Sequence, residues 1–248
     1  MKSSITQFIN MKKVILGLIA MAFSLFSNAQ SNTKNKFDYV GKLHNEIVDT
    51  YLKNNFSYQN SEELCNQINE IASKNNNFIS IVGSDNFKAD SKTIDLGIND
   101  FKNYFKNIIN NQPMSENGKQ NSQKLVNYLF ESGFSSNKVS YQELFDYIVS
   151  FENEIIISKN LTDLDKQVLL SSSSVARYSL YFWNNHFKNN NENQTTSSQG
   201  RSWWQWVIVG ACDVAGGIAG APGSPALAVT TAASASTAAY TMTNPKTK

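Results

Sequence analysis

Hydrophobic residues recur every three or four positions through most of the chain from Phe37 to Phe187, and this spacing is that of one face of an α-helix. Six segments show it, at residues 37–54, 61–77, 95–111, 121–133, 140–158 and 161–187. Only "FISIV" at 78–82 has the composition of a short strand, and no partner run is evident. The pattern therefore predicts an all-α fold, with a bundle of five or six helices over residues 30–187.

Capping residues mark several of the predicted helix starts. Ser140 and Glu143 stand three positions apart before a hydrophobic stripe, which is the spacing of a capping box, and Thr162 and Asp165 repeat it. Ser61 is the expected cap of the second helix.

The composition changes twice near the C-terminus. Residues 188–202 are polar and low in complexity, which is typical of a flexible linker. At Trp203 the chain becomes apolar and rich in glycine and alanine, and this character lasts to Tyr240. Two prolines interrupt the run, so residues 203–240 are predicted to form a helical hairpin, followed by a tail at 241–248.

Small residues in this hairpin recur four positions apart, and such rows let helix backbones approach closely. Tryptophans favour the boundary between membrane and water. The residues expected to associate with a membrane or another helix are accordingly Trp203, Trp204, Trp206, Gly210, Asp213, Gly216, Gly217 and Gly220. The carboxylate costs about 3 kcal/mol in a bilayer, which is about as much as the neighbouring aliphatic residues gain.

Two interpretations of the hairpin follow. In the first, it associates with a membrane or with a partner helix that covers Asp213, and that partner can be a second copy of the chain in a homo-oligomer. In the second, it packs on itself or on its own helical domain in water.

The first 29 residues have the features of a secretory signal peptide. Two lysines precede an apolar run of 13 residues, which is shorter than the roughly 20 needed to span a bilayer. Ser27 and Ala29 then occupy the positions that a signal peptidase reads. We expect cleavage near Ala29 and export to the periplasm or the cell exterior, with Met1 or Met11 as the initiator.

The charge of the chain argues against one class of function, and its cysteines allow two states. Removing residues 1–29 takes away three lysines and no acidic residue, which leaves 19 basic and 20 acidic residues. A chain so close to neutral, with only two arginines, lacks the electrostatic footprint of a nucleic-acid-binding protein. Cys65 and Cys212 stand far apart in sequence, and after export they either form one disulfide or remain two buried thiols.

Few residues have the pattern of a catalytic or metal site. The two histidines and two cysteines lack the spacing of a zinc site, so no metal and no cofactor are expected. His44, with Asn45, Glu46 and Asp49 near it on the same helix, is the one possible polar site. The serines at 171–174 lie inside a helical pattern, so their hydroxyls are expected to bond to the preceding turn. An enzyme that uses His44 would need a cleft that brings distant acids to it.

The segment "WWQWVIVGACDVAGGIAGAPGSPALAVTTAASASTAAY" (203–240) resembles the glycine- and alanine-rich segments of bacteriocin-like, glycine-zipper peptides. That resemblance implies insertion into target-cell membranes, often by pairs of chains. Asp213 and the missing double-glycine leader depart from the family pattern. Separately, "GKLHNEIVD" and "LTDLDKQVLLSSSSVARYSLYFW" look like parts of a group of uncharacterised exported proteins from Bacteroidetes, which brings no established activity with it.

These patterns predict an exported, non-enzymatic protein whose C-terminal hairpin associates with membrane or partner helices in a bacteriocin-like manner. The alternative is a soluble secreted interaction or structural protein in which the hairpin is packed in its own core.

Overall fold

The structure is a computed structural model of the chain. It describes residues 30–83, 87–99, 101–134, 139–191 and 199–243. Two compact units are distinguished, Met1–Thr33 and Lys34–Lys248, and the second holds every helix described below. The predicted signal peptide and most of the predicted C-terminal tail lie outside the described residues.

In the described part of the Lys34–Lys248 unit all regular secondary structure is α-helical, which confirms the all-α prediction. The helices are α2 (Asp38–Lys53), α3 (Ser61–Lys74), α4 (Asn76–Val82), α5 (Ser91–Asn99), α6 (Phe101–Asn111), α7 (Glu116–Phe134), α8 (Tyr141–Ile157), α9 (Asp163–Asn191), α10 (Gln199–Gly220) and α11 (Pro225–Thr243).

Two differences from the predicted pattern raise the number of helices before the hairpin above five or six. The strand-like segment at 78–82 lies in α4, because its backbone groups are paired locally and not with a neighbouring strand. Asn75 caps this helix by accepting a hydrogen bond from the Phe78 amide at 2.9 Å. The helix predicted over 95–111 is two helices, α5 and α6.

Side-chain caps explain where other helices begin. Ser140 Oγ accepts from the Glu143 amide at 3.2 Å while the Glu143 carboxylate accepts from the Ser140 amide at 2.6 Å, so the predicted capping box is confirmed. The box predicted at the start of α9 is present as well. At α3 the cap is Asn60 and not Ser61, because Asn60 has the extended backbone of a cap and its side chain accepts from the Glu63 amide.

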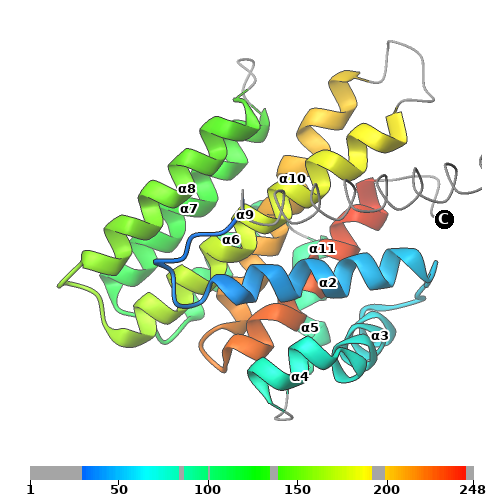
Figure 1. Cartoon of the computed structure of the whole chain (residues 1–248), viewed down its shortest axis with the longest axis horizontal. Coiled ribbons are helices and arrows are strands. Elements are labelled where there is room, and N and C mark those ends of the chain that lie inside the picture. Colours follow the sequence, from blue (N-terminus) through cyan, green and yellow to red (C-terminus); the bar gives the residue numbers. More distant parts are fainter. Residues whose placement is uncertain (1–29, 84–86, 100, 135–138, 192–198, 244–248) are drawn as a thin grey trace, which may run out of the picture. The chain divides into compact units, whose positions relative to one another are not determined.

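Helix α9 runs through the middle of the Lys34–Lys248 unit (Figure 1). Helices α2 and α10 both pack along it, and α10 makes its most extensive contact with α11. In Figure 1, α7 and α8 lie on one side of these helices, while α3, α4 and α5 lie at the other end and contact α11. The hairpin therefore has helices of the preceding bundle on several sides.

Helix α11 is a core element even though it consists mostly of alanine, serine and threonine. Every residue from Ala228 to Tyr240 is buried. Small side chains on all sides allow neighbouring helices to approach it from each direction, as expected for a helix without a polar face. The Ser234 and Thr237 hydroxyls donate to carbonyls one turn earlier at 2.9 and 2.8 Å, so their burial leaves no unpaired donor. The hairpin belongs to the same compact unit as α2–α9 and is not an appendage to it.

The predicted linker at 188–202 is partly helical. Helix α9 extends to Asn191 and α10 begins at Gln199, while residues 192–198 lie outside the described residues. The polar composition of this segment therefore concealed two helix ends, because these residues carry no hydrophobic stripe from which a helix could be predicted.

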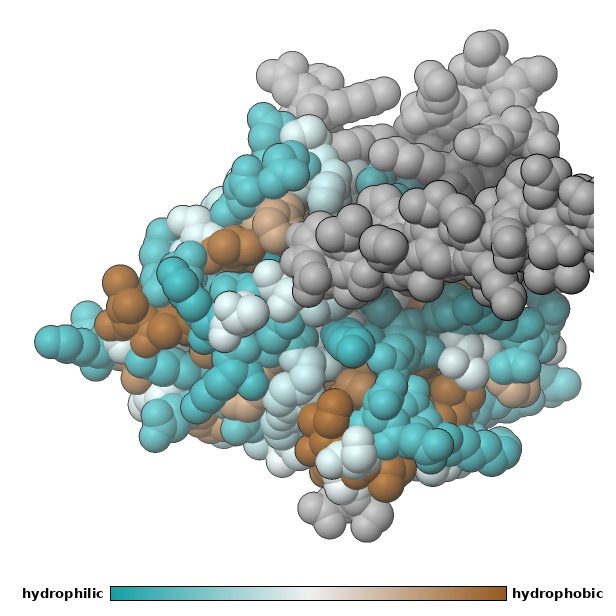
Figure 2. Space-filling model, viewed as in Figure 1, coloured by the Kyte–Doolittle hydropathy of each residue, from teal (hydrophilic) through white to brown (hydrophobic). Residues whose placement is uncertain are grey.

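The exposed surface carries few large hydrophobic side chains. On the face shown in Figure 2 hydrophilic residues predominate, and hydrophobic residues lie in small, separate groups. Among the described residues the exposed large hydrophobic side chains are Phe56, Ile81, Ile157 and Met242. None of the helices within the described ranges combines the length and the apolar character that crossing a membrane requires.

Gly216 marks a close approach of α10 to α11. A Cβ at this position would lie 2.8 Å from the Ala232 Cα and from the Thr231 carbonyl oxygen, both backbone atoms, so one helix would have to move. At Gly217, which faces α9, the nearest atom would be the Ser172 Cα at 3.3 Å. We therefore expect Gly216→Ala to lower the free energy of unfolding by about 1–3 kcal/mol relative to Gly217→Ala.

The two variants are matched because both glycines lie inside the same helix, so the gain in helix propensity from alanine cancels in the comparison. Urea unfolding of both variants beside the unsubstituted chain measures the difference. Equal midpoints for the two variants would contradict the close approach of α10 and α11.

Candidate functional site

One face of α10 turns two glycines and one carboxylate toward α9. Gly210, Asp213 and Gly217 stand three and four positions apart, so they share this face. A Cβ on Gly210 would meet the Leu180 side chain at 2.7 Å, and one on Gly217 would meet Ser172. The missing side chains at the two glycines bring α10 close enough to α9 for the short Asp213 side chain to reach that helix.

The Asp213 carboxyl group is fully buried and is bound by groups from α9. Ser179 Oγ donates to Asp213 Oδ2, and Trp183 Nε1 donates to the same oxygen at 3.2 Å. The Trp183 indole also donates to Ser236 Oγ of α11 at 3.1 Å, which joins three helices at this point. Burial outweighs the hydrogen bonds and raises the pKa of Asp213 to about 7.

His44 of α2 approaches the same carboxyl group. Its Nε2 is 3.7 Å from Asp213 Oδ2, and both side chains are completely buried. On the other side of the ring, Nδ1 lies 3.0 Å from Asn45 Oδ1, and Asn45 Nδ2 donates to the Tyr178 carbonyl at 2.8 Å. Because the Asn45 amide nitrogen donates to Tyr178, the amide oxygen is the atom that faces the ring. This oxygen can only accept, so the His44 Nδ1 carries the proton and Nε2 has a lone pair. Burial, opposed by the hydrogen bond to Asn45, lowers the pKa of His44 to about 4.

His44 and Asp213 therefore form an uncharged pair between about pH 4 and pH 7, with the proton on the carboxyl group and none added to the imidazole. His44 Nε2 and Asp213 Oδ1 have no hydrogen-bond partner, so the pair has capacity for a further proton or donor. A catalytic group must touch its substrate, and neither side chain reaches the surface. The pair can therefore affect how the helices pack, in a way that depends on its protonation.

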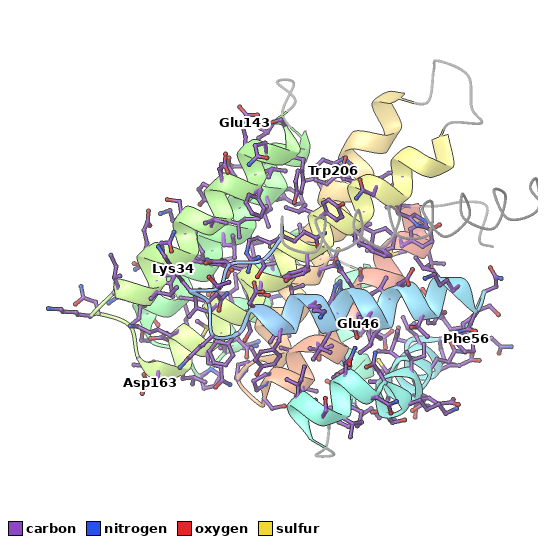
Figure 3. All side chains as sticks on the ribbon, in the orientation of Figure 1. Lys34, Glu46, Phe56, Glu143, Asp163 and Trp206 are labelled. Carbon is purple, nitrogen blue, oxygen red and sulfur yellow. The ribbon has the colours of Figure 1, made fainter. Side chains whose placement is uncertain are left out.

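The structure separates the polar group predicted around His44. Asn45 contacts the ring. Glu46, which Figure 3 labels, accepts hydrogen bonds from two asparagine side chains at the junction of α3 and α4 instead. Asp49 forms an ion pair with Lys53 at 2.5 Å near the surface. The acid beside His44 comes instead from α10, far along the chain, which sequence spacing did not indicate.

The described glycines among the residues predicted to mediate helix association lie against the chain's own helices. A Cβ on Gly216 or Gly220 would meet backbone atoms of α11. Trp206 is 2% exposed and belongs to the hydrophobic core, so it is not available to a membrane surface in this structure. The backbones of Trp203 and Trp204 lie in α10, whereas their side chains lie outside the described residues.

A second buried polar network, which sequence reasoning missed, is centred on Arg177 of α9. Arg177 Nε donates to the two oxygens of Glu152 at 3.1 and 3.0 Å, and both side chains are fully buried. A terminal nitrogen of the guanidinium group donates to Asp38 at 2.5 Å. Asn35 Nδ2 and Ser173 Oγ also donate to Glu152, at 2.8 and 3.0 Å. Burial disfavours charge on Arg177, but Glu152 and Asp38 outweigh it and raise its pKa.

A weak signal for this network was present in the sequence. Glu152 stands on the hydrophobic stripe of α8, four residues after Ile148 and three before Ile155. Arg177 stands in an equally buried part of α9. A buried ion pair is expected when one helix carries an acid on its core-facing stripe and another helix carries a base on its own. Neither charge is stable alone in a core.

Comparisons with known proteins do not assign the chain to a family. No protein family model, no curated protein and no solved structure matches it. Its function therefore has to follow from the chemistry of the described residues.

Cys65 and Cys212 are free, buried thiols, so the disulfide that was one of two alternatives is not formed. Burial raises the pKa of both thiols, which makes them poor nucleophiles. Over the described ranges, no three histidine, cysteine, aspartate or glutamate side chains are grouped so that they could hold a metal ion.

Proposed function

We propose that this chain is an exported, non-enzymatic interaction protein in which the C-terminal hairpin is a structural element of the core. The observation that carries the proposal is that the hairpin's small-residue faces are occupied. Gly216 and Gly220 lie against α11, and Gly210 and Gly217 lie against α9. Association with a membrane or a partner helix through the same faces would require α10 to leave both neighbours and to expose Asp213.

A non-enzymatic role is supported by the burial of the polar centres. Among the described residues, the fold brings together His44 and Asp213, two distant side chains with acid–base chemistry, and both are fully buried. The Arg177 guanidinium group is engaged by two carboxylates and ties α2, α8 and α9 to one another. Both centres thus support packing, which leaves binding to the surface of the molecule.

Export is part of the proposal because residues 1–29 have the features of a signal peptide. The two free thiols are compatible with an oxidising compartment because both are buried, which hinders their oxidation.

The proposal predicts slow hydrogen exchange in α10 without lipid. In lipid-free buffer the amides of residues 210–220 in the mature chain, residues 30–248, are expected to exchange as slowly as those of 168–180 in α9, because both segments are buried in one core. Hydrogen–deuterium exchange with mass spectrometry measures both segments in one experiment. A Gly216→Leu variant, in which α11 is forced away from α10, serves as the control for lost protection.

Vesicle flotation separates the proposal from membrane association. The mature chain is expected to stay in the soluble fraction with vesicles of phosphatidylcholine and of phosphatidylglycerol. Fast exchange of residues 210–220 in buffer together with flotation would overturn the structural role of the hairpin.

A further inference from the structure

A pocket of about 420 Å³ opens where the end of α2, the loop between α2 and α3, and the ends of α9 and α11 meet. Five rings line it: Tyr51, Phe56, Tyr58, His186 and Tyr240. Its volume lies in the range of about 300–1,000 Å³ that small-molecule sites occupy. Because the rings come from segments that are far apart in sequence, the fold alone assembles this site.

The rings of the pocket are held in place by contacts with one another and with the core. The Tyr51 and Phe56 ring centroids lie 5.5 Å apart. Tyr240 stacks on the buried Trp183 ring, with centroids 4.9 Å apart, and its hydroxyl lies 3.2 Å from His186 Nε2. The walls are therefore largely preformed, which reduces the entropy lost when a ligand binds.

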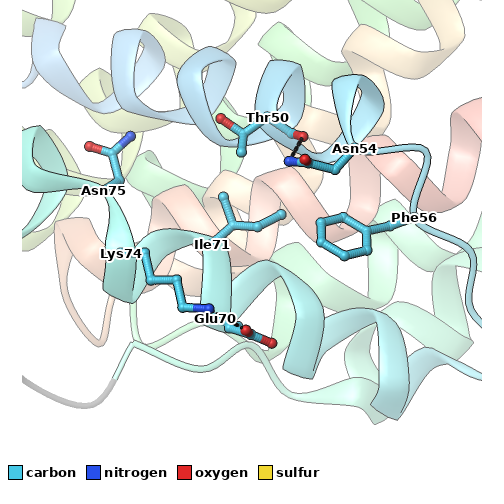
Figure 4. A pocket seen from close by; sticks show the side chains of 7 residues that line it. All are labelled: Thr50, Asn54, Phe56, Glu70, Ile71, Lys74 and Asn75. Carbon is cyan, nitrogen blue, oxygen red and sulfur yellow. Dashed lines mark hydrogen bonds and ion pairs between the residues drawn. The ribbon is translucent and has the colours of Figure 1, made fainter.

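Phe56 forms the outer wall. Asn55 before it adopts a left-handed backbone with φ of 51°, a conformation that asparagine tolerates at the end of a helix, and this turns the chain back toward Tyr51. The Phe56 side chain is 42% exposed. Figure 4 shows the opposite side of its ring, where a second hollow lies between Phe56, Ile71 and Asn54. Phe56 is therefore a half-exposed partition between two surface hollows.

A carboxylate lies near the pocket, and no cationic side chain is among the described residues that line it. The Glu63 carboxylate lies close enough to act on Tyr51, whose pKa is raised by burial, by Tyr58 and by Glu63. The hydrogen bonds to Glu63 come from the Gln59 amide at 2.8 Å and the Gln67 side chain at 3.4 Å, which are uncharged donors. The Glu63 charge is thus not neutralised by these partners.

A polar atom with no partner completes the site. The Tyr51 side chain is 3% exposed, and its hydroxyl has no hydrogen-bond partner. A buried hydroxyl without a partner destabilises the fold, so such groups in a native protein call for an explanation. At a ring-lined pocket with a carboxylate nearby, a positively charged donor would both satisfy this hydroxyl and face the rings.

We propose that this pocket binds the ammonium group of a small organic amine. The faces of the surrounding rings attract a cation through their quadrupoles. An N–H of the ammonium group donates to the Tyr51 hydroxyl, and the alkyl chain lies against Leu52 and Phe56 at the mouth of the pocket. The inference rests on the proposed function in that it names the ligand class of the same interaction protein.

Titration of the mature chain with n-pentylammonium chloride tests the inference. Amide shifts of the α2–α3 loop in 1H–15N NMR spectra are expected to saturate, with a dissociation constant about tenfold lower than that of the uncharged isostere n-pentanol. Equal affinity for the two compounds, or no saturable shift with the amine, would overturn the inference. A blocked tripeptide with a central lysine is titrated in parallel, and tighter binding of the peptide would overturn the assignment to a small molecule.

Two variants test the named atoms. Tyr51→Phe removes the hydroxyl and is expected to weaken pentylammonium binding about tenfold, since a hydrogen bond to a charged group is lost. Tyr141→Phe is the matched control, because its hydroxyl also lacks a partner but lies in α8 and does not line the pocket. Phe56→Ala removes an exposed wall and is expected to weaken binding about threefold without changing the urea midpoint.

The outcomes for the two proposals are distinguishable. Slow exchange of residues 210–220 with no amine binding would overturn the ligand assignment and leave the structural role of the hairpin standing. Fast exchange with vesicle flotation would sink the structural role of the hairpin, whatever the amine titration gives.

Discussion

Replacing Arg177 by methionine is expected to lower the free energy of unfolding by about 3–5 kcal/mol. Methionine keeps much of the volume of the arginine stem, so the change removes charge more than packing. Glu152, which is fully buried, would then lose the guanidinium charge beside it while keeping the Asn35 and Ser173 donors. Two neutral hydrogen bonds do not compensate for an ionised carboxylate in a low-dielectric core.

The double variant Arg177→Met with Glu152→Gln is expected to recover much of this loss, because no uncompensated charge remains. Lys124→Met is the control, since it breaks the Lys124–Glu154 pair, whose side chains are 54% and 61% exposed. Such an exposed pair contributes about 0–1 kcal/mol. Denaturant unfolding measures the free energy of unfolding of each of the three variants. A loss below 1 kcal/mol for Arg177→Met would contradict the buried network.

The pH dependence of stability is expected to change sign between two variants of the polar centre. The pKa of Asp213 is raised to about 7, so between about pH 4 and 7 the folded chain holds a proton that the unfolded chain has lost, and this group destabilises the fold as pH rises. The pKa of His44 is lowered to about 4, so between about pH 4 and 6.5 the unfolded chain holds the extra proton, and this group stabilises the fold as pH rises. In the unsubstituted chain the two effects largely cancel between about pH 4 and 6.5.

Replacing one residue of the pair exposes the pH dependence that the other residue contributes. Compared with the unsubstituted chain, Asp213→Asn is expected to gain about 3 kcal/mol of stability from pH 4 to pH 6.5, because only the His44 effect remains. His44→Gln is expected to lose a similar amount from pH 4 to pH 7. Urea midpoints at half-unit pH steps measure both slopes. Parallel profiles for the two variants and the unsubstituted chain would show that neither group titrates as its burial requires.

The helices themselves were largely predictable. A stripe such as Val40, Leu43 and Ile47 repeats at the helical period, and each of these residues is buried in the structure. The capping box of Ser140 and Glu143 was equally predictable, because it depends on residues three positions apart. Helix α4 was not predictable, because its short apolar run fits a strand and a short helix equally well. Only a second strand-like segment in the sequence could have favoured the strand.

The hairpin shows where local patterns stop being sufficient. Glycines four positions apart at Gly216 and Gly220 indicate that a second helix comes close, and α11 does so. The same spacing would serve a membrane partner, a second copy or the chain's own helices, because each offers the same backbone surface. Asp213 argued against a lipid environment, but the sequence carried no sign of Ser179 and Trp183 as its donors.

Local patterns in the sequence were sufficient for the all-α class, most helix positions and the glycine-rich faces of the hairpin, because these depend on residues within two turns of one another. Tertiary structure alone decided that Asp213 meets His44, that Arg177 meets Glu152, and that five rings surround one pocket. Each of these meetings joins segments that lie far apart in the sequence. Their distance is set by how closely the helix backbones pack, and that closeness is the sum of many small contacts which no single segment of the chain contains.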